Sequence, residues 1–215
     1  MICVIERKCS INTDYGKMNY LVHYPSDMKE NLPVLLFLHG IGERGDDIDD
    51  IKRFSFPAYI DDMEIPYVTI CPQCSKNNLW NYHLRDIEKI LDKTIQEYKC
   101  DKNRVCIMGS SMGAIGAWDF MMERPELFKC LISASGRVGM LIEETVSKIT
   151  DKSFLIYHGT KDDVIDYKNS VEIYDMLVKL GAKDVTLKLI EDGNHYVCST
   201  TYKDPDVYKW LVKKL

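Results

Sequence analysis

The sequence lacks several features that would place it in particular classes of protein. No apolar run is long enough to span a membrane, and the first nine residues carry charges where a secretory signal would have its apolar core. No cluster of lysine and arginine offsets the net charge of −5, so neither a nucleic acid nor an acidic membrane is an expected partner. Repeats and linkers rich in proline, glycine or serine are absent. We therefore expect one soluble cytoplasmic domain over residues 1–215, without membrane insertion.

Cysteine occurs eight times, scattered along the chain. Cys106 and Cys130 lie inside apolar runs, where a thiol behaves as a small hydrophobic group. Cys71 and Cys74 have C-x-x-C spacing, whose functional interpretations are a redox pair or half of a zinc site. Because the sequence offers no second C-x-x-C and no suitably spaced pair of histidines, we favour a structural role. We expect reduced thiols, no metal and no organic cofactor.

Short apolar runs alternate with segments of helical periodicity. Strands are expected at residues 19–24, 34–38, 67–70, 104–108, 130–134, 153–157 and 185–190. Helices are expected at residues 84–95, from 112 to near 125, at 171–180 and from 204 onward. Repeated strand–helix units predict an α/β protein with a mostly parallel central sheet, covered by helices on both faces.

The strand expected at 104–108 runs directly into the pattern G-S-S-M-G at residues 109–113. This G-x-S-x-G pattern is typical of a sharp turn from a strand into a helix, in which a β-carbon at Gly109 or Gly113 would crowd the neighbouring backbone. The central Ser111 is then turned outward, at the end of a helix where N–H groups are unpaired and negative charge is favoured. Register therefore selects Ser111 rather than Ser110 as a candidate nucleophile.

Histidine is scarce, and the five histidines leave few candidates for a catalytic base. In hydrolases with this turn, an imidazole takes the serine proton and a carboxylate holds the imidazole, in the chain order serine, acid, histidine. Only His158 and His195 follow Ser111. No acidic residue lies past a strand end between Ser111 and His158, whereas His195 follows the strand expected at 185–190 across a turn-rich loop. We predict that His195 is the base.

Three aspartates compete for the role of the acid, in the loop after the strand expected at 153–157. Open α/β sheets place their ligand sites at the carboxyl ends of such strands. Asp162 is favoured because it comes in the first turn after the strand; Asp163 is the second choice and Asp166 the third. For the other two aspartates, a solvated surface loop is the simpler interpretation.

The glycine-rich segment (residues 38–46) follows the strand expected at 34–38. Its glycines allow the backbone to bend and to turn N–H groups inward. Acyl transfer needs two such donors where the carbonyl oxygen becomes negative, and loss of one costs about 3 kcal/mol. We assign this role to the N–H groups of Ile41 and Met112. The alternative is a flexible phosphate-binding or surface loop.

Taken together, the motifs at 38–45, 71–74, 109–113, 158–162 and 193–195 resemble the α/β-hydrolase superfamily, and within it the small serine esterases of the phospholipase/carboxylesterase and dienelactone-hydrolase-like type. The resemblance implies the α/β-hydrolase fold and a triad of Ser111, Asp162 and His195. It also implies that Gln73 and Trp80 border the substrate pocket. Because the nucleophile is serine rather than cysteine, the dienelactone hydrolase reaction itself is not expected.

The function that we expect is hydrolysis of a carboxylic ester through an acyl-enzyme. Residues 135–152 leave room for little more than one helix, so we expect no sizeable cap domain and an open pocket. An open pocket near Trp80, and near Tyr82 or Tyr196, suits a small-molecule ester with a short or planar acyl group, or a saccharide-linked ester of the cinnamoyl or feruloyl type. The alternatives are an acyl-thioesterase or lysophospholipase, a peptidase of the prolyl-oligopeptidase type, and a non-catalytic binding module. The oligomeric state is left open, with a homodimer as one option.

Overall fold

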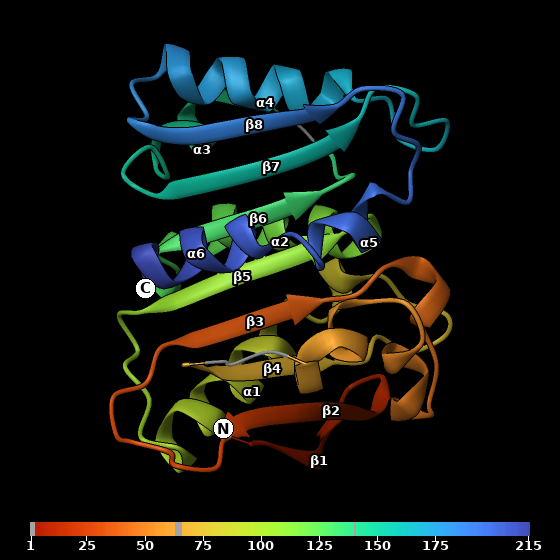
Figure 1. Cartoon of the computed structure of the whole chain (residues 1–215), viewed down its shortest axis with the longest axis vertical. Coiled ribbons are helices and arrows are strands. Elements are labelled where there is room, and N and C mark those ends of the chain that lie inside the picture. Colours follow the sequence, from red (N-terminus) through yellow and green to blue (C-terminus); the bar gives the residue numbers. More distant parts are fainter. Residues whose placement is uncertain (1–2, 63–65, 140) are drawn as a thin grey trace.

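The computed structural model describes residues 3–62, 66–139 and 141–215. The strands are β1 (Val4–Thr13), β2 (Gly16–Pro25), β3 (Val34–Leu38), β4 (Val68–Pro72), β5 (Val105–Ser110), β6 (Cys130–Ala134), β7 (Ser153–Gly159) and β8 (Asp184–Ile190). In this described part they form one eight-stranded sheet, in the order β1-β2-β4-β3-β5-β6-β7-β8 (Figure 1). β2 pairs antiparallel with both of its neighbours, and the other pairs are parallel.

Both faces of the sheet are covered, and alternate residues of the central strands face opposite sides. In β3, Leu36 and Leu38 pack into one hydrophobic cluster, whereas Leu35 and Phe37 pack into the other. All five residues of this strand are buried. A parallel strand that is covered on both faces has a continuous apolar sequence, which is why residues 34–38 could be identified without any alternation.

The helices divide between the two faces. Residues of α1 (Leu84–Glu97), α2 (Met112–Glu123), α3 (Glu143–Ser147) and α4 (Lys168–Lys179) join the first cluster. Residues of η2 (Ile48–Lys52), η3 (Phe56–Asp62) and α6 (Pro205–Lys214) join the second, with α5 (Val197–Thr201) beside them. In Figure 1, α6 crosses in front of the sheet while α1 and α2 lie behind it. None of the described helices is both long and apolar enough to cross a membrane.

The predicted α/β-hydrolase fold is confirmed. Each strand predicted from the sequence is present, with bounds that differ by a few residues. Between β6 and β7, the described residues hold one short helix, α3, so no sizeable cap covers the carboxyl ends of the strands. Three further short 3-10 helices, η1 (Ile41–Glu43), η4 (Trp80–Tyr82) and η5 (Pro125–Leu127), lie in loops.

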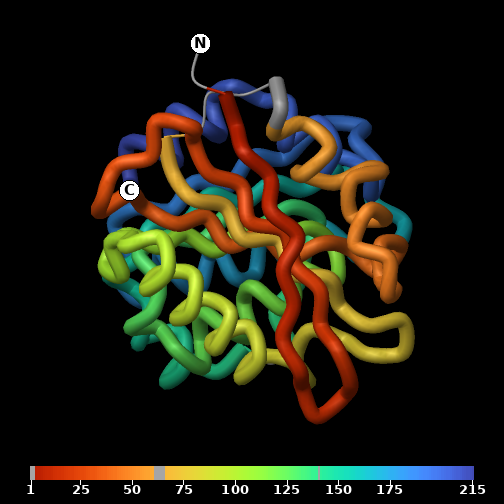
Figure 2. The backbone as a smooth tube through the Cα atoms, turned by 90° about the horizontal axis from the view of Figure 1, so that it is seen from below, coloured from red at the N-terminus to blue at the C-terminus, as the bar shows by residue number. Residues whose placement is uncertain are grey.

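β1 was not predicted from the sequence. This strand lies at the edge of the sheet and pairs with β2 along its whole length, from Val4 opposite Pro25 to Thr13 opposite Gly16. Four consecutive residues after Val4 are exposed, three of them charged, because an edge strand outside the core needs little apolar surface. Figure 2 shows the hairpin running across the front of the molecule in that view, with its turn projecting beyond the neighbouring loops.

Candidate active site

The turn from β5 into α2 has a backbone that only small neighbours permit. A β-carbon on Gly109 would lie 2.2 Å from the carbonyl oxygen of Gly113, and one on Gly113 would lie 1.9 Å from the carbonyl oxygen of Leu38. Ser111, between the two glycines, has φ 53° and ψ −120°, a conformation that is strained for a residue with a side chain. The strain turns the Ser111 hydroxyl away from the sheet and toward the loops at its carboxyl edge.

The structure brings Ser111 together with the histidine and the aspartate that were favoured from the sequence. Ser111 Oγ lies 2.8 Å from His195 Nε2, and His195 Nδ1 lies 2.8 Å from Asp162 Oδ2 and 3.0 Å from Oδ1. The Asp162 carboxylate can only accept on Nδ1, so that nitrogen carries the proton and Nε2 is free to accept from the serine hydroxyl. Asp163 and Asp166 are exposed and take no part in this chain of hydrogen bonds.

Asp162 is held as an anion inside the protein. Its side chain is fully buried, which by itself raises the pKa of the carboxyl. The backbone N–H groups of Ile165 and Val164, each 2.9 Å from Oδ1, and the His195 ring act in the opposite direction. Their combined effect places the pKa of Asp162 below its ordinary value. The carboxylate therefore stays charged and can orient the imidazole of His195 over a wide range of pH.

A second histidine, His158, holds Asp162 from the other side. Its Nε2 lies 3.1 Å from Asp162 Oδ2 and 2.9 Å from the carbonyl oxygen of Ile165, and its Nδ1 lies 2.7 Å from Ser170 Oγ. Because both neighbours of Nε2 only accept, that nitrogen is the donor, and Nδ1 accepts from the Ser170 hydroxyl. Burial lowers the pKa of His158, which keeps the ring neutral. From the sequence, His158 was weighed only as a base, and this role was not predicted. The signal for it was an aspartate four residues after a histidine at a strand end.

The loops that carry the aspartate and the histidine are locked together. A β-carbon on Gly159 would lie 2.2 Å from the carbonyl oxygen of Gly193, so the two backbones touch. The Lys161 N–H donates to the Gly193 carbonyl at 2.8 Å. Ser135 Oγ, from the loop after β6, donates to the carbonyl oxygen of His195 at 3.1 Å. Residues from three strand ends are thereby fixed around one point.

The N–H groups of Ile41 and Met112 are available as donors. Neither donates a hydrogen bond to any other residue that the structure describes. The backbones that carry them approach closely, because a β-carbon on Gly40 would lie 3.6 Å from Ser111 Cβ. Met112 is the first residue of α2, where N–H groups have no partner inside the helix.

The side chains of Gln73 and Trp80 lie beneath the glycine-rich segment rather than on the surface. Gln73 is 2 % exposed, and its Nε2 donates to the carbonyl oxygens of Glu43 at 3.2 Å and Asp47 at 2.8 Å. Trp80 is 1 % exposed, and its Nε1 donates to the carbonyl oxygen of His39 at 2.9 Å. Both residues hold the glycine-rich segment in place, and substrate contact by either of them stays a prediction.

His39 is a further anchor of the same segment. It is fully buried, and burial lowers its pKa to about 4, so the ring is neutral. Its Nδ1 lies 2.6 Å from the carbonyl oxygen of Gly40 and donates to it, which leaves Nε2 to accept from the Cys74 N–H at 3.0 Å. Hydrogen bonds from the buried side chains of Gln73, Trp80 and His39 thus hold the segment that carries Ile41.

Three exposed apolar side chains lie in the segments that carry Gly40, Asp162 and His195. Ile41 is 54 % exposed, Val164 66 % and Tyr196 74 %, and the Tyr196 ring centroid lies 6.2 Å from that of His195. Tyr82 is 55 % exposed and packs edge-on against Tyr15 at the hairpin turn. Single exposed apolar residues are common, but Val164 and Tyr196 lie within two residues of Asp162 and His195, and Ile41 follows Gly40, which lies next to Ser111.

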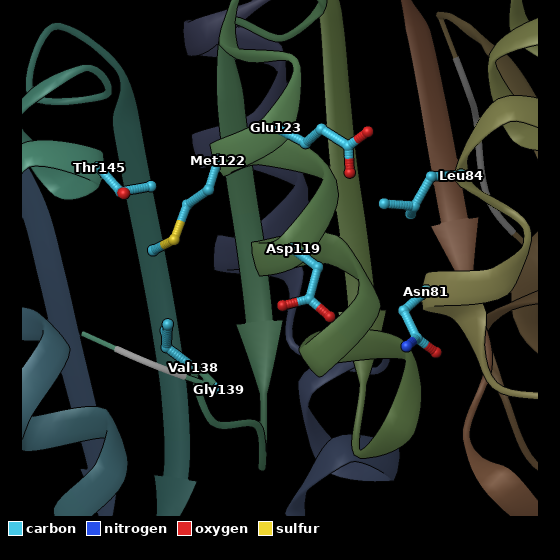
Figure 3. A pocket seen from close by; sticks show the side chains of 8 residues that line it. All are labelled: Asn81, Leu84, Asp119, Met122, Glu123, Val138, Gly139 and Thr145. Atoms are coloured by element: carbon cyan, nitrogen blue, oxygen red, sulfur yellow. The ribbon is translucent and has the colours of Figure 1, made fainter. Parts of the chain in front are cut away.

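A cavity of about 370 Å³ opens along α2 (Figure 3). Asp119, Met122 and Glu123 line it from the helix. These residues lie 8, 11 and 12 positions after Ser111, so the cavity begins about two helical turns from the end of α2 that carries the serine. Asn81 and Leu84 line it on one side of α2, and Val138, Gly139 and Thr145 line it on the other. Burial raises the pKa of Asp119, although the positive charge of Arg137 reduces the effect.

The C-x-x-C pair shows no redox or metal-binding geometry. Cys71 and Cys74 are both free and buried, and they pack into opposite hydrophobic clusters. Burial raises the pKa of both thiols, that of Cys74 to about 12. Across the described residues, no group of three or more histidine, cysteine, aspartate or glutamate side chains is placed to hold a metal ion.

The sequence between residues 66 and 212 matches the model of one protein family, described as phospholipase/carboxylesterase. The match covers more than half of the chain and includes Ser111, Asp162 and His195. The chain belongs to the phospholipase/carboxylesterase family. This is a family of carboxylic ester hydrolases within the α/β-hydrolase fold. A search among curated protein sequences finds no match.

Solved structures of esterases share the fold of this family member. A thermostable esterase is 26 % identical with a TM-score of 0.84; the alignment covers 97 % of this chain but only 63 % of that protein. The feruloyl esterase module of Clostridium thermocellum in complex with sinapinate is 13 % identical, with a TM-score of 0.75, 99 % of this chain covered and 89 % of the module. The acylaminoacyl peptidase of Pyrococcus horikoshii is 16 % identical, with a TM-score of 0.77, and 99 % of this chain covers 42 % of that protein.

Proposed function

We propose that the chain is a serine carboxylesterase that works through an acyl-enzyme, with Ser111 as nucleophile, His195 as general base and Asp162 as the carboxylate that orients the base. The observation that carries this proposal is the unbroken chain of hydrogen bonds from Ser111 Oγ through His195 to Asp162. Nucleophile, base and orienting group are each within hydrogen-bond reach of the next, as acyl transfer requires. Membership of an ester hydrolase family supports the same reaction.

In the first half of the reaction, His195 Nε2 takes the Ser111 proton while Oγ attacks the carbonyl carbon of the ester. The carbonyl oxygen becomes negative and receives hydrogen bonds from the N–H groups of Ile41 and Met112. His195 then gives the proton to the leaving alcohol, and the acyl group stays on Ser111. In the second half, a water molecule gives a proton to His195 as it attacks the acyl carbon. His195 then returns this proton to Ser111 Oγ as the bond between Oγ and the acyl carbon breaks, and the acid is released.

Replacing the nucleophile tests this proposal. We expect Ser111→Ala to lower kcat for a nitrophenyl ester on the order of 10⁴-fold or more. Ser110→Ala is the matched control, since Ser110 is the adjacent serine but is 4 % exposed at the end of β5. Labelling with a fluorophosphonate probe, located by mass spectrometry, should modify Ser111 only. Full activity in Ser111→Ala, or an unlabelled wild-type protein, would exclude the mechanism and favour a binding module.

The substrate that we propose is an ester with a short or aromatic acyl group, linked to a saccharide. Ile41, Val164 and Tyr196 are exposed in the segments that carry the site and offer apolar contacts to such an acyl group. The cavity along α2 begins eight residues beyond Ser111, which corresponds to about 12 Å along the helix. A short acyl group does not reach that far. The amide of Asn81 and the carboxyls of Asp119 and Glu123 suit the hydroxyl groups of a sugar on the alcohol side of the ester.

A pair of feruloyl esters, one with methanol and one with an oligosaccharide, tests this assignment. Asp119→Ala should raise KM about ten-fold for the oligosaccharide ester, because hydrogen bonds to a charged group are lost, and should leave the methyl ester unchanged. Asp175→Ala on α4 is the control for loss of one exposed carboxylate. Equal effects on both esters would show that the cavity is not a sugar site. Faster turnover of acyl-thioesters or long-chain lysophospholipids than of either feruloyl ester would favour the thioesterase or lysophospholipase alternative.

A peptidase is the less supported alternative. The fold is shared with the acylaminoacyl peptidase, but this chain spans 42 % of that protein. Ile41, Val164 and Tyr196, in the segments that carry the site, are exposed and apolar. Among the described residues, no carboxylate is hydrogen-bonded to Ser111, where it could bind a peptide amine. Turnover of aminoacyl nitroanilides at rates comparable to nitrophenyl esters would overturn this preference.

A further inference from the structure

A buried carboxyl group lies in the glycine-rich segment, two residues after Ile41. Glu43 is the last residue of η1 and is 7 % exposed. Its Oε1 is buried and has no hydrogen-bond partner among the residues that the structure describes. Burying a carboxylate without a counter-charge is costly, so a group in this position is favoured in its neutral form.

The groups around Glu43 supply dipoles but no positive charge. The Ser55 hydroxyl and the N–H groups of Gly40, Ser55 and Phe54 lower the pKa of the carboxyl. The adjacent Arg44 is directed elsewhere, with Nη1 3.1 Å from the carbonyl oxygen of Asn78 and Nε 3.3 Å from that of Ile41.

The titratable groups that face Glu43 from other elements are acids as well. They are the thiols of Cys71 in β4 and Cys198 in α5 and the phenol of Tyr202, and in each case the Glu43 charge contributes to a raised pKa. Burial raises the pKa of Glu43 itself to about 7, against the smaller effects of Ser55 and the N–H groups. The carboxyl therefore changes its charge close to neutrality.

We infer that Glu43 is a positioning residue that supports the glycine-rich segment in its protonated form, and that loss of its proton weakens ester hydrolysis. The inference rests on the proposed function, in which the Ile41 N–H stabilises a negative oxygen. An ionised Glu43 opposes the stabilisation of this oxygen in two ways. Its charge repels the developing oxyanion through a poorly screened interior, and its need for solvation favours an outward movement of η1, which displaces the Ile41 N–H.

The experiment compares wild type with Glu43→Gln, which is close in shape and uncharged at every pH. With kcat/KM measured for one nitrophenyl ester, the ratio of variant to wild type should rise about ten-fold between pH 6 and pH 8, as the protonated fraction of Glu43 falls. The use of a ratio cancels every effect of pH that is common to both proteins. Asp46→Asn, an exposed carboxylate three residues further along, should give a flat ratio.

Glu43→Met serves as a second variant in case the buried amide of glutamine impairs folding, and the same rise in the ratio is expected. A flat ratio in both variants, or an equal loss of activity at every pH, would overturn the inference. The rate of fluorophosphonate labelling of Ser111, followed across the same pH range, should show the same difference between variant and wild type. If wild-type Ser111 is not labelled at any pH, the proposed function itself fails; if it is labelled and the ratio is flat, only the role of Glu43 fails.

Discussion

At the scale of single residues, one carboxylate connects most of the site. Asp162 accepts from His195 on one side, lies against His158 on the other, and receives two backbone N–H groups. The neighbouring Asp163 has the same charge but is exposed. The preference for Asp162 is therefore a matter of geometry, since only its carboxyl lies within reach of the imidazole.

Replacement of each aspartate by asparagine distinguishes the role of Asp162 from that of Asp163. Asp162→Asn should lower kcat on the order of 10⁴-fold, because an amide no longer fixes the tautomer of His195 and no longer stabilises its charged form. Asp163→Asn should change kcat less than about two-fold, because exposed charges in solvent act weakly. Both are measured as steady-state hydrolysis of a nitrophenyl ester, with circular dichroism to check folding. A large loss in the second variant alone would reverse the assignment.

The candidate residues that must follow a fixed order along the chain could be predicted from the sequence. Residues that hold other site residues in place could not. Ser111, Asp162 and His195 could be selected because a strand end, a turn and an order along the chain constrain them. His158 and Glu43 carry no such constraint, and their partners come from loops that become neighbours only after folding. Gln73 and Trp80 were placed near the pocket by resemblance, and the structure shows their side chains engaged with the backbone of the glycine-rich segment.

At the scale of elements, the junction of β5 and α2 depends on the absence of two β-carbons. We expect Gly113→Ala to destabilise the fold by at least about 3 kcal/mol, because a β-carbon would collide with the carbonyl group of Leu38 and force β3 and α2 apart. Gly42→Ala is the control, since nothing lies within 4 Å of a β-carbon there. Urea unfolding measures both changes. Equal stability of the two variants would mean that the junction relaxes more easily than its contacts indicate.

The elements that were predicted correctly are those in which one physical requirement dominates. Central strands such as β3 are covered on both faces and must be apolar throughout, so residues 34–38 were evident. The edge strand β1 is defined by its pairing with β2, and its charged residues 6–8 face solvent. No local pattern in the sequence contains that pairing. Short 3-10 helices such as η1 escaped prediction for the same reason, since loop contacts rather than periodicity determine them.

At the scale of the whole molecule, two buried carboxyls give opposite dependences of stability on pH. The pKa of Asp162 is lowered by folding, so its stabilising contribution is present above its ordinary pKa and is lost as the pH falls through the folded value. The pKa of Glu43 is raised from 4.5 to about 7, so its contribution is present below 4.5 and is lost as the pH rises toward 7.

The loss of the Glu43 contribution at higher pH can be measured as the free energy of unfolding in urea between pH 4.5 and pH 8. Relative to wild type, the free energy of unfolding of Glu43→Gln should increase by as much as about 3 kcal/mol over this interval, since one pKa unit corresponds to about 1.4 kcal/mol. Glu126→Gln on the surface should show no comparable gain. A difference that does not change with pH would show that Glu43 titrates normally in the folded protein.

The contact between Gly159 and Gly193 limits the conformational freedom of the two loops that carry Asp162 and His195. Because the two backbones touch, the loop with Asp162 and the loop with His195 cannot drift independently, and they move as one body. The conformational freedom of the two loops is therefore lost once, when the chain folds, and not again each time an ester enters. In the mechanism that we propose, every turnover begins with imidazole and carboxylate already aligned. The rate should then depend little on the internal motion of these loops and mainly on how well an ester fits against Ser111.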